Sequence, residues 1–409
     1  MISANLLKVW DAEYPWDIRV EKVARALTEA GFAVHLASRN RRCEVTIQQL
    51  PEATVHRMPC WRPLPKALRD ALMFPAPVNP RWLAFLWSLA RRVQPRVLLC
   101  RDLPLAVPSW IVARRMGLPI VLDMAEHYPA MLRSRWTAGR TRPLDVLARN
   151  PRMAAAVERW IIPKVDHVIA VVEESRARFV ELGAAPDRVS VVSNTPLRAN
   201  VRPPRAPAAA PIRVAYLGLI EEQRGIGTLI RSASLLKSRG IAFELAVIGD
   251  GKEYDEFRAL ARREGLDAPQ ITFHGHLENQ VAQEVLRQAH IGVIPHYADE
   301  SWNFTIPNKL FDYMAAGLAV VTSDAIPAAR VCRETGTGRV FRSQSTESLA
   351  EELASLIGSP SEIDRCSSAG RRWILERYNW EHDTVELVRV MRETITSRAG
   401  LTSSHHYLA

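Results

Sequence analysis

Residues 305–324 constrain the fold most, because they combine a polar helix start, a glycine stop and a buried strand. Leu310 and Met314 stand four positions apart, so the predicted helix buries one face. Gly317 ends that helix, and residues 318–322 form the apolar run of a strand covered on both faces. The pattern is typical of a helix and a strand in an α/β domain.

The polar residues of this segment gather where the helix begins. A helix N-terminus has free N–H groups and partial positive charge, and Lys309 adds a full charge there, so this end suits a phosphate. Asp312, four residues after Asn308, could accept hydrogen bonds from ribose hydroxyls. The alternative is an ordinary amphipathic helix capped by Asn308, with Lys309 in solvent.

The chain has 409 residues, enough for two domains, and its 47% apolar residues can supply their cores. It contains no run of about 18 uncharged apolar residues, and it begins without a signal-peptide pattern. Its five cysteines are scattered, which favours a reducing compartment and argues against a thiolate metal site. We therefore expect a cytoplasmic protein with neither a bound metal nor a cofactor.

The net charge of +10 is concentrated in the first half of the chain. Residues 1–200 contain 30 basic and 18 acidic residues, whereas residues 201–409 contain 24 and 26. Such asymmetry suits an anionic partner, namely nucleic acid, anionic lipid or a pyrophosphate lipid, unless arginine simply solubilises the surface. Residues 81–92, an apolar stretch flanked by arginines near Trp61, could lie on an anionic membrane or pack in the core.

Strand and helix patterns alternate in both halves, which predicts two parallel sheets covered on both faces. The expected strands are residues 5–10, 32–37, 55–58, 97–100, 120–122, 167–171, 189–192, 213–217, 244–248, 271–274, 291–294, 319–322 and 339–341. The expected helices are residues 19–30, 81–93, 105–116, 174–182, 225–239, 253–264, 281–288, 308–316, 348–356, 363–377 and 383–396.

Five prolines among residues 196–211 can continue neither a helix nor a sheet, so this segment is the predicted linker. It separates a first domain of residues 1–195 from a second of residues 212–380. Residues 381–409 remain for a last helix, expected to cross back to the first domain, and a tail. The predicted fold class is α/β, with two Rossmann-like, doubly wound parallel-sheet domains facing across a cleft.

Glycine turns follow two strands of the second half. Gly218 ends a strand, and its missing side chain would let a diphosphate approach the backbone. Arg224 stands at the start of the next helix and could supply positive charge, and Gly249 lies in a tight turn after the following strand. No G-x-G-x-x-G fingerprint follows the first strand of either half, which argues against a dinucleotide oxidoreductase.

Candidate side chains also follow strands of the first half. Asp17 is a predicted N-cap, and Arg19 in the next turn is unfavourable beside a helix N-terminus unless an anion is near. Asp123, Glu126 and His127 come at the end of a buried strand and are candidates for lining a ligand site. A loop whose carboxylates cap the following turn is the alternative.

Residues 305–324 closely resemble the nucleotide-binding segment of GT-B glycosyltransferases of the retaining family four, in a polysaccharide-biosynthesis-like subgroup with P-N-K-L-F-D-Y-M-A-A-G. Residues 214–230, 246–252 and 11–25 resemble other parts of the same family, so the likeness covers nearly the whole chain. It implies a GT-B fold, with a nucleotide-sugar-binding second domain and an acceptor-binding first domain.

The resemblance also implies roles for individual residues. The donor-binding residues would be Gly218, Arg224, Gly249, His296, Thr305, Asn308, Lys309 and Asp312. The acceptor-binding residues would be Asp17, Arg19 and Asp123. The catalytic residues would be Glu126, His127, Arg224 and Lys309.

The chain departs from the family pattern at three positions. Leu219 stands where the family often has a basic residue beside the diphosphate, which leaves more of that charge to Lys309. Ala125 stands at the usual histidine. Phe304 stands where many members have a first glutamate, so contacts to the sugar would fall to the polar neighbours His296, Asn303 and Thr305.

The function implied is metal-independent, retaining transfer of a hexose from a nucleotide-diphosphate sugar to a glycan or lipid-linked acceptor, in bacterial surface polysaccharide synthesis. The family's usual front-face mechanism requires no protein nucleophile. We expect a cytoplasmic enzyme that is peripheral on the inner face of an anionic membrane. The alternatives are an epimerase-like GT-B enzyme and a non-catalytic basic nucleic-acid-binding protein, although nucleic acid is not the expected partner.

Overall fold

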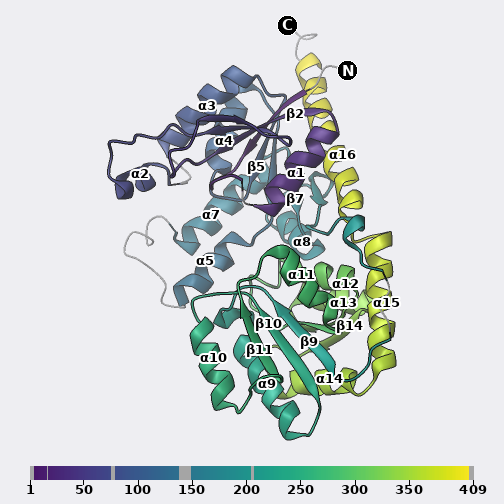
Figure 1. Ribbon diagram of the computed structural model, residues 1–409. Coiled ribbons are helices and arrows are strands. Elements are labelled where there is room, and N and C mark those ends of the chain that lie inside the picture. Colours follow the sequence, from purple (N-terminus) through teal and green to yellow (C-terminus); the bar gives the residue numbers. More distant parts are fainter. Residues whose placement is uncertain (1–3, 16, 75–78, 138–148, 204–206, 405–409) are drawn as a thin grey trace. The chain divides into compact units, whose positions relative to one another are not determined.

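The computed structural model describes residues 4–15, 17–74, 79–137, 149–203 and 207–404 (Figure 1). The chain forms two compact units, Met1–Ser193 with Asp383–Ala409, and Asn194–His382. Each unit has its own hydrophobic core around a mainly parallel sheet. The predicted α/β class is confirmed.

The first unit contains an eight-stranded sheet in the order β3-β4-β2-β1-β5-β6-β7-β8. Its strands are β1 Ala4–Val9, β2 Phe32–Ser38, β3 Ile47–Gln49, β4 Thr54–Arg57, β5 Val97–Arg101, β6 Ile120–Met124, β7 His167–Ala170 and β8 Val189–Val191. All neighbours are parallel except β3, which is antiparallel to β4. The sequence did not predict β3, because this short edge strand has no buried residue to produce an alternating pattern.

The helices of this unit include three that the sequence analysis missed, α2, α5 and α7. The bounds are α1 Ile18–Glu29, α2 Lys66–Leu72, α3 Pro80–Val93, α4 Ala106–Met116, α5 Tyr128–Thr137, α7 Pro151–Ile161, α8 Glu173–Glu181 and α16 Trp380–Ser404. The idea of α3 as a membrane-surface helix is wrong, because Trp82, Leu86 and Leu89 of its apolar face are buried in the core.

Cysteine pairing also differs from expectation. Cys43 and Cys60 form a disulfide, because the turn before β3 and the segment after β4 lie side by side. The guanidinium of Arg69 contacts both sulfur atoms, with Nη1 3.0 Å from Sγ of Cys43. The expectation of a fully reduced set therefore does not hold, while Cys100, Cys332 and Cys366 are free and buried.

The second unit contains a six-stranded parallel sheet in the order β11-β10-β9-β12-β13-β14. Its strands are β9 Ile212–Leu217, β10 Phe243–Ile248, β11 Ile271–Gly275, β12 Ile291–Ile294, β13 Ala319–Ser323 and β14 Gly338–Phe341. All six were predicted to within one residue. The order reverses between β9 and β12, which makes the carboxyl ends of these two strands the place where ligands bind in open α/β sheets.

Seven helices surround this sheet among the described residues. Six of them are α9 Ile226–Ser238, α10 Tyr254–Arg263, α11 Asn279–Gln288, α12 Lys309–Ala316, α14 Thr346–Ile357 and α15 Pro360–Glu376, and the sequence analysis missed the seventh, α13 Ile326–Thr335. Helices α9, α10 and α14 pack together, and α11, α12 and α15 form another group (Figure 1). Short 3-10 turns, η3 Arg198–Asn200 and η4 Glu222–Arg224, lie in the linker and before α9.

Helix α12 is fixed to the sheet through Tyr313. Its ring packs on Gly292 of β12, where an added Cβ would lie 2.4 Å from the ring. Its hydroxyl accepts a hydrogen bond from the backbone N–H of Leu217 at 2.8 Å. The helix start is therefore held at a defined height above the end of β9.

Helix α16 begins in the second unit and continues into the first. The backbone N–H of Trp380 donates to the Pro196 carbonyl oxygen at 2.8 Å. Further along, Arg389 contacts the Ser190 hydroxyl at 3.3 Å and Arg398 forms an ion pair with Asp166 at 2.8 Å. Within the described residues, none of the helices combines the length and the apolar character that a membrane crossing requires.

Replacing Gly292 with alanine tests how α12 is seated. The new Cβ must displace the Tyr313 ring, so we expect the free energy of unfolding to fall by about 1–3 kcal/mol. Chemical denaturation measures the change. Gly358→Ala, at the end of α14, is the control, because the atom nearest to its added Cβ is the Ala354 carbonyl oxygen at 3.3 Å; it should change stability much less than Gly292→Ala does. Equal effects of the two substitutions would contradict this account.

Candidate functional site

The predicted donor residues of the second unit come together around the ends of β9, β10 and β12. Gly218 follows β9, and a Cβ there would lie 2.5 Å from Nζ of Lys309. Gly249 follows β10, and a Cβ there would lie 1.9 Å from the carbonyl oxygen of Gly218. Both glycines have positive φ, +148° and +135°. Glycine at these positions lets two loops and the start of α12 approach closely.

Lys309 places a buried ammonium group at this point. Part of its stem is exposed, but Nζ is buried and has no hydrogen-bond partner. It lies 4.2 Å from the centroid of the Tyr216 ring, whose face partly compensates a positive charge. Burial lowers the pKa of Lys309 well below its ordinary value, and the charge of Arg224 lowers it further, against an opposing effect of Asp312.

Arg224 is the second cation, and it is held by two ring systems. Its Nη1 lies 2.9 Å from Nε2 of His296, and its guanidinium carbon lies 4.8 Å from the centroid of the Trp302 ring. The sequence analysis proposed Arg224 and His296 but missed Trp302. Nothing in the local sequence indicates Trp302, because it lies in the long loop between β12 and α12.

His296 is buried, with 1% of its surface exposed. Burial lowers its pKa well below the usual value, and the charges of Lys309 and Arg224 add to this effect. Its Nδ1 has no hydrogen-bond partner. Nζ of Lys309 and Nδ1 of His296 are thus buried hydrogen-bond donors without acceptors, which costs stability. An anionic ligand would offset that cost by accepting hydrogen bonds.

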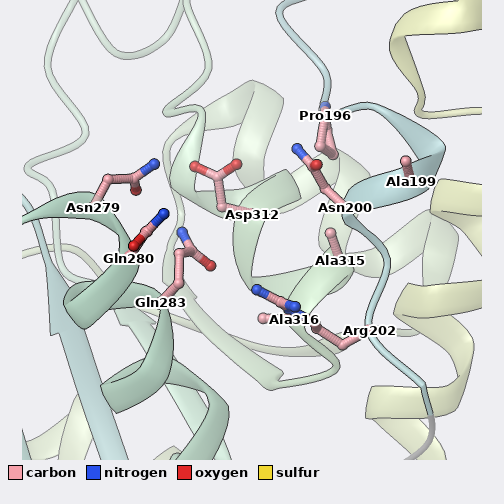
Figure 2. A pocket seen from close by; sticks show the side chains of 10 residues that line it. All are labelled: Pro196, Ala199, Asn200, Arg202, Asn279, Gln280, Gln283, Asp312, Ala315 and Ala316. Atoms are coloured by element: carbon pink, nitrogen blue, oxygen red, sulfur yellow. The ribbon is translucent and has the colours of Figure 1, made fainter.

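A pocket of about 320 Å³ lies beside Asp312 in the same unit (Figure 2). Its lining comes from η3 and the following linker, the first turns of α11, and α12. The lining residues are Pro196, Ala199, Asn200, Arg202, Asn279, Gln280, Gln283, Asp312, Ala315 and Ala316. Amide, guanidinium and carboxylate groups together suit a hydroxyl-rich or heteroaromatic ligand that both donates and accepts hydrogen bonds.

The other two predicted donor residues flank this arrangement. Thr305 is buried in the loop before α12, and Asn308 is exposed at the N-cap position. The Asn308 side chain makes no capping hydrogen bond, so the simple capping interpretation of this residue is wrong. The roles of Thr305 and Asn308 in ligand binding stay predictions.

In the first unit, Arg19 is engaged within the protein. It forms an ion pair with Asp123 at 2.6 Å, and both side chains are at most 3% exposed. It also donates to the carbonyl oxygens of Val192 and Ser193 at 3.0 Å. Burial alone would raise the pKa of Asp123, but the surrounding cations hold it well below its usual value. The expected N-cap is confirmed, since Asp17 accepts from Val20 N–H at 2.8 Å.

Two further cations, which the sequence analysis missed, lie near this pair. Arg101 at the end of β5 contacts Asp102 at 3.2 Å and Asp123 at 3.6 Å. Lys8 in β1 is fully buried, its Nζ has no hydrogen-bond partner, and burial lowers its pKa to about 8. A charged residue within a strand pattern predicts a position that faces solvent. The sequence alone therefore does not reveal that Lys8 and Arg101 are buried together with Asp123.

Glu126 and His127 follow β6, as expected. Glu126 is exposed, whereas His127 is buried and its Nδ1 accepts a hydrogen bond from Ala130 N–H at 3.1 Å. Burial lowers the pKa of His127 to about 4, with Arg178 contributing. A catalytic role for either residue stays a prediction. No group of three or more His, Cys, Asp or Glu side chains suited to a metal ion occurs within the described part of the chain.

Both halves of the chain match known family models. Residues 17–195 match the glycosyl transferase 4-like domain, and residues 211–359 match the glycosyl transferases of group 1. The chain belongs to the group 1 glycosyltransferases. The family prediction is thereby confirmed, while the subgroup stays a prediction.

Similar proteins include two characterised transferases and a solved structure. The chain is 24% identical over 301 residues to a D-inositol 3-phosphate glycosyltransferase of Rhodococcus erythropolis, over 70% of this chain and 65% of that one. It is 29% identical over 190 residues to a phosphatidyl-myo-inositol mannosyltransferase of Mycolicibacterium smegmatis, over 46% of each. The chain thus matches only about half to two thirds of these relatives' lengths.

HepE from Anabaena, solved in complex with UDP and glucose, has a TM-score of 0.67 to this glycosyltransferase. The match covers 96% of this chain and 100% of that chain at 13% identity. At that identity the likeness concerns the fold, and it places both units in the GT-B class.

Replacing Lys309 with methionine tests whether its charge serves a ligand. Without ligand, removing an unpaired buried charge should raise the free energy of unfolding by about 1 kcal/mol or more. Because the pKa of Lys309 is lower in the folded state than in the unfolded chain, the wild type becomes more stable as pH rises toward 10.5. The difference in free energy of unfolding between Lys309→Met and the wild type should therefore become smaller. The rise in Tm that a nucleoside diphosphate causes by mass action should disappear.

Lys237→Met is the matched control, because Lys237 is exposed on α9 and donates to the Gly265 carbonyl oxygen. This variant should keep the ligand-induced rise in Tm. A Lys309→Met protein that is less stable than the wild type and still responds to ligand would contradict a binding role for the ammonium group.

Proposed function

We propose that the protein transfers a hexose from a nucleotide-diphosphate sugar to an acceptor, with retention at the anomeric carbon and without a metal ion. The observation that carries this proposal is the buried Nζ of Lys309, which has no hydrogen-bond partner and feels the charge of Arg224. Asp312, one turn further along the same helix, lines the pocket. Two cations suit a diphosphate, and a carboxylate beside them suits ribose hydroxyls. HepE, of the same fold, was solved in complex with UDP and glucose.

The donor would be arranged along the start of α12. The diphosphate would lie against Lys309, Arg224 and the glycine loops at Gly218 and Gly249, which pack closely against each other. The nucleoside would occupy the pocket of Figure 2, with Asp312 at the ribose. His296, Thr305 and Asn308 complete the proposed donor-binding set.

The chemistry required of these residues is electrostatic. Breaking the bond between the sugar and the diphosphate leaves negative charge on the phosphate oxygen, and fixed cations in a buried site stabilise that charge. In a front-face reaction the acceptor oxygen bonds to the anomeric carbon on the face from which the diphosphate departs, so the sugar keeps its anomeric configuration. The departing phosphate takes the proton of the acceptor hydroxyl. Glu126 and His127 remain the proposed catalytic residues of the first unit.

The first unit is the proposed acceptor domain, with Asp17, Arg19 and Asp123 as its proposed acceptor residues. Because Arg19 and Asp123 already bind each other, we infer that they shape this surface as a pair. The two relatives described above are named for inositol-containing compounds, one of them a phospholipid. These names support a lipid-linked saccharide acceptor of the kind used in surface polysaccharide synthesis.

The proposed membrane-facing surface is the segment around α2. This helix buries none of its residues, Trp61 and Leu68 are 55% and 47% exposed, and Lys66 is exposed as well. The Arg81 guanidinium lies 4.6 Å from the Trp61 ring centroid. Apolar side chains among basic ones fit an anionic membrane surface.

The two alternative functions differ in their products and ligands. An epimerase-like enzyme would release free nucleoside diphosphate without extending an acceptor. A nucleic-acid-binding protein would bind with steep salt dependence and without response to nucleotide sugars. The polar pocket at Asp312, together with the buried Lys309 on the same helix, favours the transferase.

An assay of sugar transfer from a panel of nucleotide sugars to lipid-linked acceptors tests the reaction. Asp312→Asn should raise the KM for the donor about tenfold or more, because hydrogen bonds to a carboxylate contribute about 1.5–3 kcal/mol. Glu284→Gln, an exposed carboxylate on α11, is the control. Nucleotide release without a glycosylated product would support the epimerase, and an inverted linkage would contradict retention.

Sedimentation with vesicles tests the proposed surface. At low salt the protein should bind vesicles of anionic lipid and not neutral ones, and Trp61→Ser with Leu68→Ser should reduce binding at least several-fold. Val385→Ser removes an apolar side chain of α16 that is 70% exposed, more than Trp61 or Leu68, and should have no effect. Absence of binding to anionic vesicles at low salt would refute a peripheral membrane location.

A further inference from the structure

The loop after β9, which contains η4, and the loop after β12 form the proposed diphosphate side of the second unit. Hydrogen bonds and close backbone packing connect them. Backbone N–H of Tyr297 donates to the Gln223 carbonyl oxygen at 3.2 Å, and the Tyr297 hydroxyl donates to the Glu222 carboxylate. A Cβ on Gly225 would lie 1.8 Å from the carbonyl oxygen of Pro295, so only glycine permits this approach. The loop after β12 therefore supports η4, which carries the arginine of the site.

Trp302 is the side chain of this loop that touches both members of the arginine–histidine pair. The guanidinium carbon of Arg224 lies 4.8 Å from its ring centroid, within the range of a cation–π interaction. The His296 ring centroid lies 4.4 Å away at an interplanar angle of 60°. The Trp302 backbone N–H donates to the Asp299 carboxylate at 2.9 Å, which fixes this part of the loop.

The contact between Arg224 and His296 also determines where the histidine carries its proton. A guanidinium has donors only, so Nη1 of Arg224 must donate and Nε2 of His296 must accept. A neutral imidazole that accepts at Nε2 carries its hydrogen on Nδ1. His296 thus serves Arg224 as a fixed acceptor.

We propose that Trp302 and His296 are positioning residues that hold the guanidinium of Arg224 ready for the donor diphosphate. This inference rests on the proposed function and adds to it the reason why one arginine suffices. Leu219, where the family often has a basic residue, is apolar and 52% exposed, so it brings no charge.

Orientation matters more for Arg224 than for Lys309. An ammonium group is a compact charge that acts without a preferred direction, whereas a planar guanidinium binds two phosphate oxygens only when its fork faces them. Support on one face by Trp302 and at Nη1 by His296 fixes the plane before the ligand arrives. Because the Arg224 guanidinium is already ordered in the free protein, less conformational entropy is lost when the diphosphate binds.

Calorimetric titration of the full chain with nucleoside diphosphates and with inorganic pyrophosphate tests the inference. Trp302→Leu should raise Kd about tenfold, whereas Trp302→Phe, which keeps an aromatic face, should stay within about threefold. Trp373→Leu, the same substitution on α15 where the ring contacts Tyr378, should leave Kd unchanged. His296→Phe keeps a ring beside Trp302 but removes the acceptor, and it should weaken binding several-fold.

A double-mutant cycle separates positioning of Arg224 from a general loss of structure. In the Arg224→Met background, Trp302→Leu should cause no further loss of affinity, because the group that it positions is gone. An equal loss in both backgrounds, or no loss in the wild-type background, would overturn the inference while leaving the proposed function intact. A wild-type protein that binds neither nucleotides nor pyrophosphate would refute both.

Nitrogen-15 NMR of the histidines gives a readout that needs no ligand. At neutral pH His296 should be uncharged, with its hydrogen on Nδ1, and Arg224→Met should change the signal of Nε2. A hydrogen on Nε2 in the wild type would overturn the inference, because Arg224 could not then donate to that atom.

Discussion

The second unit keeps the half-buried Arg224 close to the buried Nζ of Lys309. Arg224 is near enough to disfavour the charge on Lys309, and burial disfavours it more. Such an arrangement costs stability in the absence of an anion, so its presence at the carboxyl ends of β9 and β12 requires a reason beyond folding. A ligand diphosphate supplies that reason, because it offsets both the repulsion and the desolvation.

In the first unit, by contrast, carboxylates lie among the buried cations, although Nζ of Lys8 has no hydrogen-bond partner there. Arg19 and Arg101 lie at the carboxyl end of the first sheet, yet Asp123 contacts both and Asp102 contacts the second. The ion pair between Arg19 and Asp123 connects α1 to β6. In both sheets the strand order reverses once, between β1 and β5 in the first and between β9 and β12 in the second. What distinguishes a structural ion pair from a ligand site is therefore where the carboxylates lie.

Much of the fold followed from hydrophobic pattern and turn chemistry. The apolar run of residues 319–322 and the stop at Gly317 were enough to place β13 and the end of α12. The pattern failed for short or irregular elements such as β3 and α2, which bury almost nothing. It also failed for Lys8, because a lysine within a strand is expected to face solvent, whereas Lys8 is buried.

The sequence by itself determined the two α/β domains, the family, and the identity of Lys309, Arg224 and Asp312 as candidate ligands. The domains follow from local spacing, which sets the elements and their ends, whereas the family and the roles of these residues follow from the resemblance of residues 305–324 and 214–230. Only the tertiary structure decided that Arg19 is paired, that Cys43 binds Cys60, and that Trp302 supports Arg224. Trp302 is 78 positions from Arg224 in sequence, and close packing of two loops, permitted by a missing Cβ, brings them together.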